Sequence, residues 1–282
     1  MLLYRWLLSR EGKLIPLPVV FWVTLLLVQP ARFPGATAQT INTTEDLTRQ
    51  ATLVFKGTVE KTGASTMPAV NASAFTAVVR VDQVIDGPGA PPGLVGKQIT
   101  VQLLDPRSVK PGTQAIFFTK GWLLGNSMAV IEVGRVASTV DVQRLGEQIK
   151  STRQKMADEK LLDELATAEI IIVGRVTNVR PADVPHIGSE HDPDWYQANI
   201  LGESVLKGKL PGHEVTLLFP HSDDVMWHDS PKFREGEQGI WLLHRNQARL
   251  PGIENQYTVL NPLDFRSREE LNRVQRLLKA AP

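Results

Sequence analysis

The stretch QATLVFKGTVEK (50–61) recurs later in the chain as TAEIIIVGRVTN (167–178). When Gly57 is aligned with Gly174, both copies place an apolar run with β-branched residues around one glycine. Such a run predicts a buried strand, and the glycine within it indicates a bulge or a bend. This pair decides the fold, because it indicates that the chain repeats a β-rich unit.

Three further segments follow each copy in the same order. The matches are FTAVVRVDQVIDG (75–87) with YQANILGESVLKG (196–208), GKQITVQLLD (96–105) with GHEVTLLFPH (212–221), and PGTQAIFFTKG (111–121) with EGEQGIWLLHR (235–245). Each unit closes with one more strand candidate, at 127–136 and at 255–264. The pattern predicts a tandem duplication of a domain with about five strands, a size that suits a small closed or partly open barrel.

Helical segments are predicted before, between and after these units. The first is TTEDLTRQA (43–51), which offers a threonine N-cap and acids in its first turn. Segment 138–168 contains no proline and has apolar residues at helical spacing, so it predicts one long helix or two short ones. A last helix is predicted within 266–282. Capping-box patterns open the last two segments, at Ser138 with Asp141 and at Ser267 with Glu270.

The repeated unit resembles the OB-fold domain similar to tissue inhibitors of metalloproteinases, in a cysteine-free bacterial form. The pieces that carry this resemblance are AEIIIVGRV (168–176), ESVLKG (203–208) and EGEQGIWLLHR (235–245). The resemblance covers roughly residues 44–136 and 160–265, and it implies a five-stranded Greek-key barrel with a flanking helix. Animal inhibitors of this kind chelate the protease zinc through an N-terminal cysteine. This chain contains no cysteine, so inhibition by that mechanism is excluded.

The expected fold class is therefore mainly β, with two tandem five-stranded OB-like barrels, a helical linker and a C-terminal helix. The expected domains are a first barrel over 39–137, the linker over 138–166, and a second barrel with the C-terminal helix over 167–282. A chain of 282 residues is long enough to bury a core in each. The absence of cysteine also excludes disulfides, thiolate zinc sites, iron–sulfur clusters and a cysteine nucleophile.

Residues 1–38 have the pattern of a secretory signal peptide. A basic start precedes the uncharged, apolar run 14–28, and the segment ends in Ala-Thr-Ala (36–38), an A-x-A cleavage site. We expect cleavage before Gln39 and export to the periplasm or the extracellular space of a bacterium. The alternative is an uncleaved N-terminal segment that anchors the protein in a membrane.

Charge argues against a nucleic-acid partner. The chain has 31 Lys and Arg and 30 Asp and Glu, and residues 1–38 hold four of the bases but one of the acids. The remainder is therefore slightly acidic, and it contains no tract of five basic residues. We expect a protein or glycan ligand in the envelope, no nucleic acid, no cofactor, and membrane association only if the N-terminal segment is retained.

Histidines and aspartates gather in two stretches of the second unit, VPHIGSEHDPDWY (184–196) and FPHSDDVMWHD (219–229). The second stretch lies where the first unit has only DPRSVK (105–110), so it belongs to an elaborated loop. Imidazole and carboxylate ligands suit zinc or another borderline divalent ion. The candidate metal ligands are His186, His191, His221 and His228. No strict ligand spacing such as H-E-x-x-H occurs, so a purely polar surface loop remains the competing interpretation.

Aromatic residues in the same loops are candidates for partner contacts. Those that we expect to bind are Trp195, Tyr196, Trp227 and Phe233. Trp227 has polar neighbours, so it can serve as a surface anchor or fold back and pin its own loop. Trp241, within GIWLLH, is expected in the core.

No catalytic motif such as G-x-S-x-G occurs, and no paired carboxylates stand in a recognisable frame. The sequence thus favours an exported, non-enzymatic binding or scaffolding protein of a bacterial envelope, with its contacts made by loops of the second barrel. The alternative is a metal-binding protein or a metal-dependent enzyme that uses the histidines of that barrel.

Overall fold

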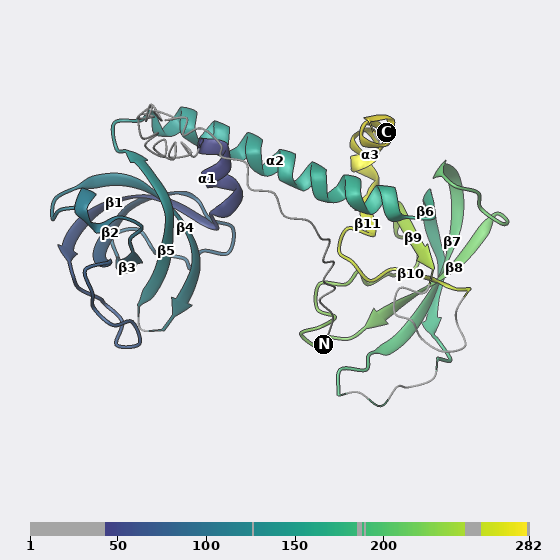
Figure 1. The fold of residues 1–282 in the computed structure, drawn as a ribbon. Coiled ribbons are helices and arrows are strands. Elements are labelled where there is room, and N and C mark those ends of the chain that lie inside the picture. The colour runs from purple at the N-terminus through teal and green to yellow at the C-terminus, as the bar shows by residue number, and fades with distance from the viewer. Residues whose placement is uncertain (1–42, 126, 185–187, 189, 246–254, 281–282) are drawn as a thin grey trace, which may run out of the picture. The chain divides into compact units, whose positions relative to one another are not determined.

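A computed structural model describes residues 43–125, 127–184, 188, 190–245 and 255–280, and it contains two closed five-stranded barrels (Figure 1). The strands of the first are β1 (Leu53–Thr62), β2 (Thr76–Asp86), β3 (Gln98–Gln102), β4 (Gln114–Leu124) and β5 (Met128–Ala137). Those of the second are β6 (Ile170–Pro181), β7 (Asp194–Lys207), β8 (Glu214–His221), β9 (Gln238–Arg245) and β10 (Tyr257–Thr258). The mainly β fold with two tandem barrels is confirmed.

The two barrels share one strand order. The first closes in the order β1-β2-β3-β5-β4, with β3 and β5 parallel and the other neighbours antiparallel. The second has β6-β7-β8-β10-β9, in which β10 lies parallel to β8 and antiparallel to β9. A short extra strand, β11 (Phe265–Ser267), pairs with β9. This order is consistent with an OB-like fold.

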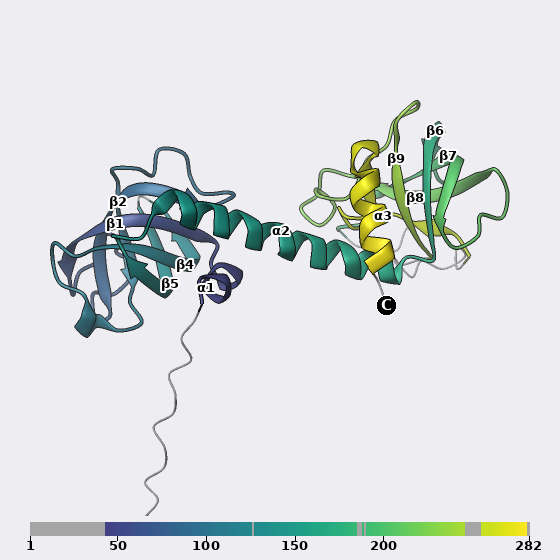
Figure 2. The ribbon, with the colours of Figure 1, turned by 90° about the horizontal axis from the view of Figure 1, so that it is seen from above.

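Helices cover the outer face of the first strand of each barrel. These helices are α1 (Thr44–Gln50), α2 (Val142–Thr167) and α3 (Leu271–Ala280). Two short 3-10 turns occur elsewhere, at Pro106–Ser108 and Arg268–Glu270. Figure 2 shows α3 beside the C-terminal end of α2. Segment 138–168 therefore forms one long helix, the first of the two predicted possibilities, and both of its ends pack on a barrel.

Strands β1 and β6 are buried on both faces. In β1, Leu53 and Phe55 point into the barrel, whereas Val54 lies under Leu47 of α1 and Leu145 of α2. In β6 the same alternation places Ile170 and Ile172 inside, and Ile171 and Val173 under Leu161 and Leu165 of α2 and Val274 of α3. Two-sided burial explains why both stretches read as continuous apolar runs rather than as alternating ones.

The aligned glycines allow each first strand to approach its neighbour closely. A Cβ atom on Gly57 would lie 2.7 Å from Val79 Cγ1, and one on Gly174 would lie 2.4 Å from the carbonyl oxygen of Leu201. The strand register shifts at both glycines, between Lys56 and Gly57 in β1 and between Val173 and Gly174 in β6. The predicted bulge is therefore present in both copies.

Three local predictions are wrong. The strand expected over 255–264 is limited to Tyr257–Thr258, because the chain then turns into the tight segment that ends at Asp264. Ser138 does not cap α2; the N-cap is Asp141, whose carboxylate accepts from the backbone N–H of Gln143 and Arg144. Ser267 makes no side-chain capping bond either, since Glu270 instead pairs with Arg266 and Arg273. By contrast, Thr43 caps α1 as expected.

Replacing Gly174 with alanine is expected to destabilise the second barrel by about 1–3 kcal/mol, because the added methyl group overlaps a backbone carbonyl that cannot move freely. Gly146 provides a control of opposite sign. It lies in α2 with nothing within 4 Å of an added Cβ, so Gly146→Ala should stabilise the chain by about 0.5–1 kcal/mol. Chemical denaturation followed by circular dichroism measures both. Equal effects from the two variants would contradict the close-approach argument.

Replacing Asp141 with alanine is expected to lower the free energy of unfolding by about 1 kcal/mol, because two backbone donors at the start of α2 lose their acceptor. Ser138→Ala is the matched control and should change it by less than about 0.5 kcal/mol. Denaturant titrations of the two variants measure the difference. A larger loss from Ser138→Ala would place the cap at the position that the sequence pattern suggested.

Candidate functional site

Two long connections of the second barrel leave it at the same end. The β6–β7 loop covers 182–193, of which 185–187 and 189 lie outside the described residues, and the β8–β9 loop covers 222–237. Since β7 runs antiparallel to both β6 and β8, the end of β6 and the end of β8 lie at one edge of the barrel. The two histidine-containing stretches of the sequence therefore meet in space.

Two contacts join these two loops, and a third joins the β8–β9 loop to Trp195 at the start of β7. His191 Nδ1 lies 3.0 Å from Asp224 Oδ2. The indole Nε1 of Trp227 donates a hydrogen bond to the backbone oxygen of His191 over 2.6 Å. The ring of Trp227 packs edge-on against that of Trp195, with 5.9 Å between their centroids. Trp227 thus folds back onto the barrel and pins the loops together, which is the second of the two roles expected for it.

Asp224 organises the tip of the β8–β9 loop. Its Oδ1 accepts from the backbone N–H of Met226 over 2.8 Å, while Oδ2 faces His191. These hydrogen bonds, the backbone one first, lower the pKa of the Asp224 carboxyl. The backbone oxygen of Asp224 also accepts from the N–H of Trp227 over 2.9 Å. One carboxylate therefore fixes both the tip of its own loop and the position of the other loop.

The C-terminal part of the β8–β9 loop is anchored by Lys232 and Phe233. Lys232 Nζ donates to the backbone oxygens of Trp227 and Ser230, and partial burial lowers its pKa. The Phe233 ring packs edge-on against Phe219 at 5.1 Å and against Phe265 at 5.3 Å. Phe233 is only 6% exposed, so it belongs to the barrel core rather than to the surface.

The four predicted binding residues mostly hold the loops in place. Trp195 is buried beside Val184, Tyr196 is half-buried and stacks on His221 with 4.5 Å between ring centroids, and Trp227 is half-buried against Trp195. Among the described residues of the two loops, the large apolar side chains that are exposed are instead Val225 at 84% and Met226 at 61%. The sequence signal for them was available, since both are apolar and stand in the middle of the loop segment that the first copy lacks.

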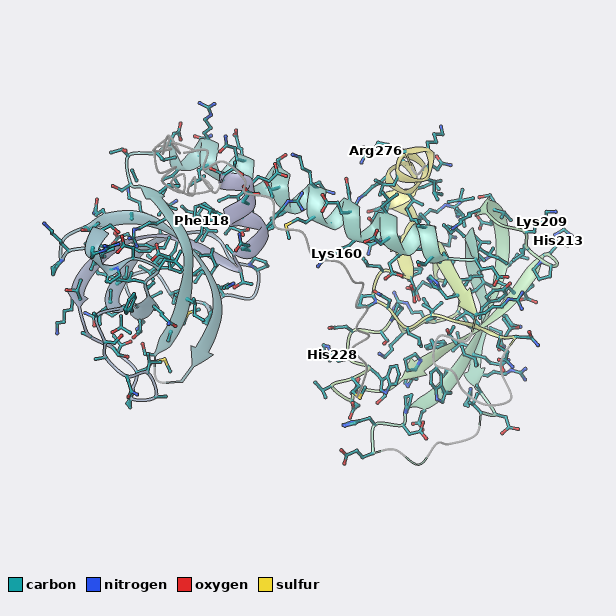
Figure 3. All side chains as sticks on the ribbon, viewed as in Figure 1. Phe118, Lys160, Lys209, His213, His228 and Arg276 are labelled. Carbon is teal, nitrogen blue, oxygen red and sulfur yellow. The ribbon has the colours of Figure 1, made fainter. Side chains whose placement is uncertain are left out.

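The predicted histidines do not share a site where the structure describes them. His191 contacts Asp224, and His221 stacks on Tyr196. His228, which Figure 3 labels, is exposed and lies 3.1 Å from Asp229. His186 lies outside the described residues. Within the described part of the chain, no group of three ligand atoms within 4.8 Å of one another includes any of these histidines.

The sequence reasoning missed a different cluster, formed by Glu164, His244 and Asp264. His244 lies within the stretch EGEQGIWLLHR (235–245), whose Trp241 is expected in the core. The available signal was a histidine directly after Leu242 and Leu243, in a strand whose preceding residues from Ile240 on are apolar and buried. Its partners come from α2 and from the turn after β10, and no sequence spacing connects them.

The corresponding connections of the first barrel, 63–75 and 103–113, are joined by the backbone N–H of Leu103, which donates to the Phe75 oxygen over 2.7 Å. The β1–β2 connection folds back over its own barrel, where Thr66 N donates to Thr100 Oγ1 over 2.8 Å and Thr66 Oγ1 lies 2.8 Å from Ser127 Oγ. A shallow apolar pocket of about 280 Å³ lies between Val70 of this connection and the seam of β3 and β5 around Ile131. The β8–β9 loop (222–237) is thus longer than its counterpart at 103–113, whereas the β1–β2 connection (63–75) is at least as long as the β6–β7 loop.

Comparisons with known proteins do not assign the chain to a family. No helix among the described residues is long and apolar enough to cross a membrane, and the predicted signal segment 1–38 lies outside them. No protein-family model and no curated protein matches the chain. The OB-like arrangement is supported by the order and direction of the strands.

Proposed function

We propose that the protein is a non-enzymatic binding module whose second barrel contacts a protein partner through the tip of the β8–β9 loop. The observation that carries the proposal is the exposure of Val225 and Met226, at 84% and 61%, between Asp224 and Trp227, which are both bonded to the β6–β7 loop. Two adjacent exposed apolar side chains form a surface whose burial against a partner is favourable in free energy, because it removes apolar area from water.

Immobilisation of the tip favours binding. Asp224 accepts from Met226 N, Trp227 is bonded to the β6–β7 loop, and Lys232 holds two carbonyl oxygens of the segment. A loop that is already ordered loses less conformational entropy when a partner binds. The His191–Asp224 pair has a structural use in this arrangement, because it joins the two loops that present the tip.

A protein partner fits better than a glycan. Glycan recognition commonly relies on open aromatic faces, and in this loop pair the rings of Trp195 and Trp227 pack on each other while Tyr196 is stacked by His221. The groups left exposed at the tip are an aliphatic chain and a flexible thioether, which suit an apolar protein surface. The crosslinking experiment below distinguishes a protein partner from a glycan ligand.

The place of action that we propose is the bacterial envelope. The support is the signal-peptide pattern of residues 1–38 together with the lack of cysteine. We also propose, on the sequence pieces quoted above and the barrel strand order, that the domains are related to those of tissue inhibitors of metalloproteinases. That relation implies no inhibitory activity for this chain, since the zinc-chelating cysteine is lacking.

Photo-crosslinking tests the proposal. With p-benzoylphenylalanine at position 225, cells that make the full chain should yield a discrete protein adduct after irradiation, because the tip would lie against the partner. The matched control is position 95, a valine of the first barrel that is 59% exposed and belongs to no elaborated loop. Adducts are resolved by gel electrophoresis and identified by mass spectrometry.

Adducts at 225 but not at 95 support the proposal, and they should disappear when Met226 is changed to aspartate. The same adducts at both positions, or none at 225, would contradict it. If the chain is retained on envelope glycan and gives no protein adduct at 225, the ligand is a glycan and not a protein.

A Trp227→Phe variant tests whether the tip is pinned. It removes the indole donor to His191 but keeps an aromatic ring against Trp195, so we expect a net loss of about 0.5–1.5 kcal/mol, confined to the loops. In hydrogen-exchange measurements the amides of Trp227 and Ser230 should exchange several-fold faster, while that of Phe55 in the first barrel stays unchanged. Unaltered exchange in the loop would show that the indole bond does not restrain it.

A further inference from the structure

Glu164, His244 and Asp264 come from three separate elements of the second barrel and its cover. Glu164 lies in the last turn of α2, His244 near the end of β9, and Asp264 in the turn that precedes β11. His244 Nε2 lies 3.3 Å from Asp264 Oδ1 and 3.8 Å from Glu164 Oε2. One ligand atom from each residue lies within 4.8 Å of the other two.

Two of the three facing atoms are buried and have no hydrogen-bond partner. His244 is 5% exposed and Asp264 is fully buried, and neither His244 Nε2 nor Asp264 Oδ1 has a partner with hydrogen-bond geometry among the described residues. A buried polar atom without a partner is costly, so native structures rarely keep one without a reason. Here two such atoms face the same point.

The second oxygen of each carboxylate is held by hydrogen bonds. Asp264 Oδ2 accepts from the backbone N–H of Leu260 and of Asn261, each over 2.9 Å. Glu164 Oε1 accepts from Asn261 Nδ2 over 2.7 Å. The turn 260–264 thus orients both carboxylates and leaves one oxygen of each directed at His244. Outer contacts of this kind orient the ligands of metal sites.

The cluster places two carboxyl groups beside one imidazole. With a neutral imidazole, the two carboxylates place two negative charges side by side, and among the ion pairs of the described residues they pair only with His244. Burial raises the pKa of Glu164 and the charge of Asp264 raises it further, while His244 opposes the shift. A divalent cation would neutralise both carboxylates.

The first barrel shows that the fold does not need this polar cluster. Ala51 and Ala168 occupy equivalent positions, and their N–H groups donate to the carbonyl oxygens of Leu47 and Glu164 respectively, so these two residues correspond. The strand pairing gives the counterpart of His244. Thr119 of β4 pairs with Leu53 of β1, and Leu243 of β9 pairs with Ile170 of β6. The next residue in each strand is Lys120 in β4 and His244 in β9, so these two correspond. The first copy packs a buried leucine where the second has a carboxylate.

We propose that Glu164 Oε2, His244 Nε2 and Asp264 Oδ1 bind one divalent transition-metal ion of the zinc class. Ligand atoms at about 2.0–2.1 Å from a tetrahedral ion stand about 3.3 Å apart, which is the separation of His244 Nε2 and Asp264 Oδ1, and Glu164 Oε2 lies 3.8 Å from His244 Nε2. The imidazole favours such an ion over Mg²⁺ or Ca²⁺. The fourth position is left for water or an external ligand on the side of Glu164, which is the half-exposed member.

The bound ion would join α2 to β9 and to the turn before β11. Metal binding to the folded state should therefore raise the stability of the second barrel, since the three ligands are brought together only by folding. This inference does not depend on the proposed partner, because the ligands belong to the barrel and its cover and none belongs to the β6–β7 or β8–β9 loop.

Calorimetric titration with Zn²⁺ tests the site. The full chain, purified without a polyhistidine tag and freed of metal with a chelator, should bind one Zn²⁺ per chain. Its Tm should rise by about 5–10 °C at a Zn²⁺ concentration 100-fold above Kd. Asp264→Asn and Glu164→Gln keep the oxygen that accepts the supporting hydrogen bonds. They replace the proposed ligand oxygen, which faces His244, by an amide NH2 group that cannot ligate the metal. Each should weaken binding by about 100-fold or more.

His228→Ala is the matched control, because His228 is exposed and belongs to the other histidine group, and it should leave binding unchanged. If Asp264→Asn fails to fold, Glu164→Gln still decides, since its side chain sits on the half-exposed helix face. Absence of stoichiometric zinc, or binding that both amide variants leave intact, would overturn the proposal. Loss of binding in His191→Ala or His228→Ala alone would assign the zinc to the loop histidines instead.

Discussion

The structure depends on the burial of one strand in each unit on both of its faces. Strands β1 and β6 contribute to the barrel interior with every second residue and to a helix-covered layer with the residues between. A strand in this position needs a barrel on one side and helices on the other, so neither part can be removed without exposing apolar surface. The glycines at 57 and 174 add a second requirement, because they let the neighbouring strand approach closely enough to close the barrel.

These strands were predictable because burial on both faces requires a continuous run of apolar residues, and the duplication makes this run occur twice. The fifth strand of the second unit was less predictable. Closure of that barrel needs only Tyr257 and Thr258 to pair with β8 and β9, and two residues carry no periodicity. The predicted start of α2 was wrong for a related reason. Asp141 can cap a helix by itself, so the sequence is compatible with a start after Ser138 or after Asp141.

The candidate sites were harder to predict because they depend on which distant residues meet. The sequence marked the β8–β9 loop as elaborated, but only the antiparallel order of β6, β7 and β8 shows that it meets the β6–β7 loop. Phe233 has polar neighbours in the sequence and yet fills the core. His244 was hidden by the apolar strand around it, and its partners lie 80 and 20 positions away in the chain.

Helix α2 has a consequence for where one unit ends and the next begins. Its first turns occupy the place that α3 holds after the second barrel, and its last turns hold the place of α1 before the first. The closing helix of one copy and the opening helix of the next have therefore merged into one uninterrupted rod. A boundary drawn near the middle of α2 would cut the helix, and each fragment would keep a half-helix of a length that is only marginally stable alone. The two barrels are repeated in sequence, yet they share the one helix that covers the first strand of each.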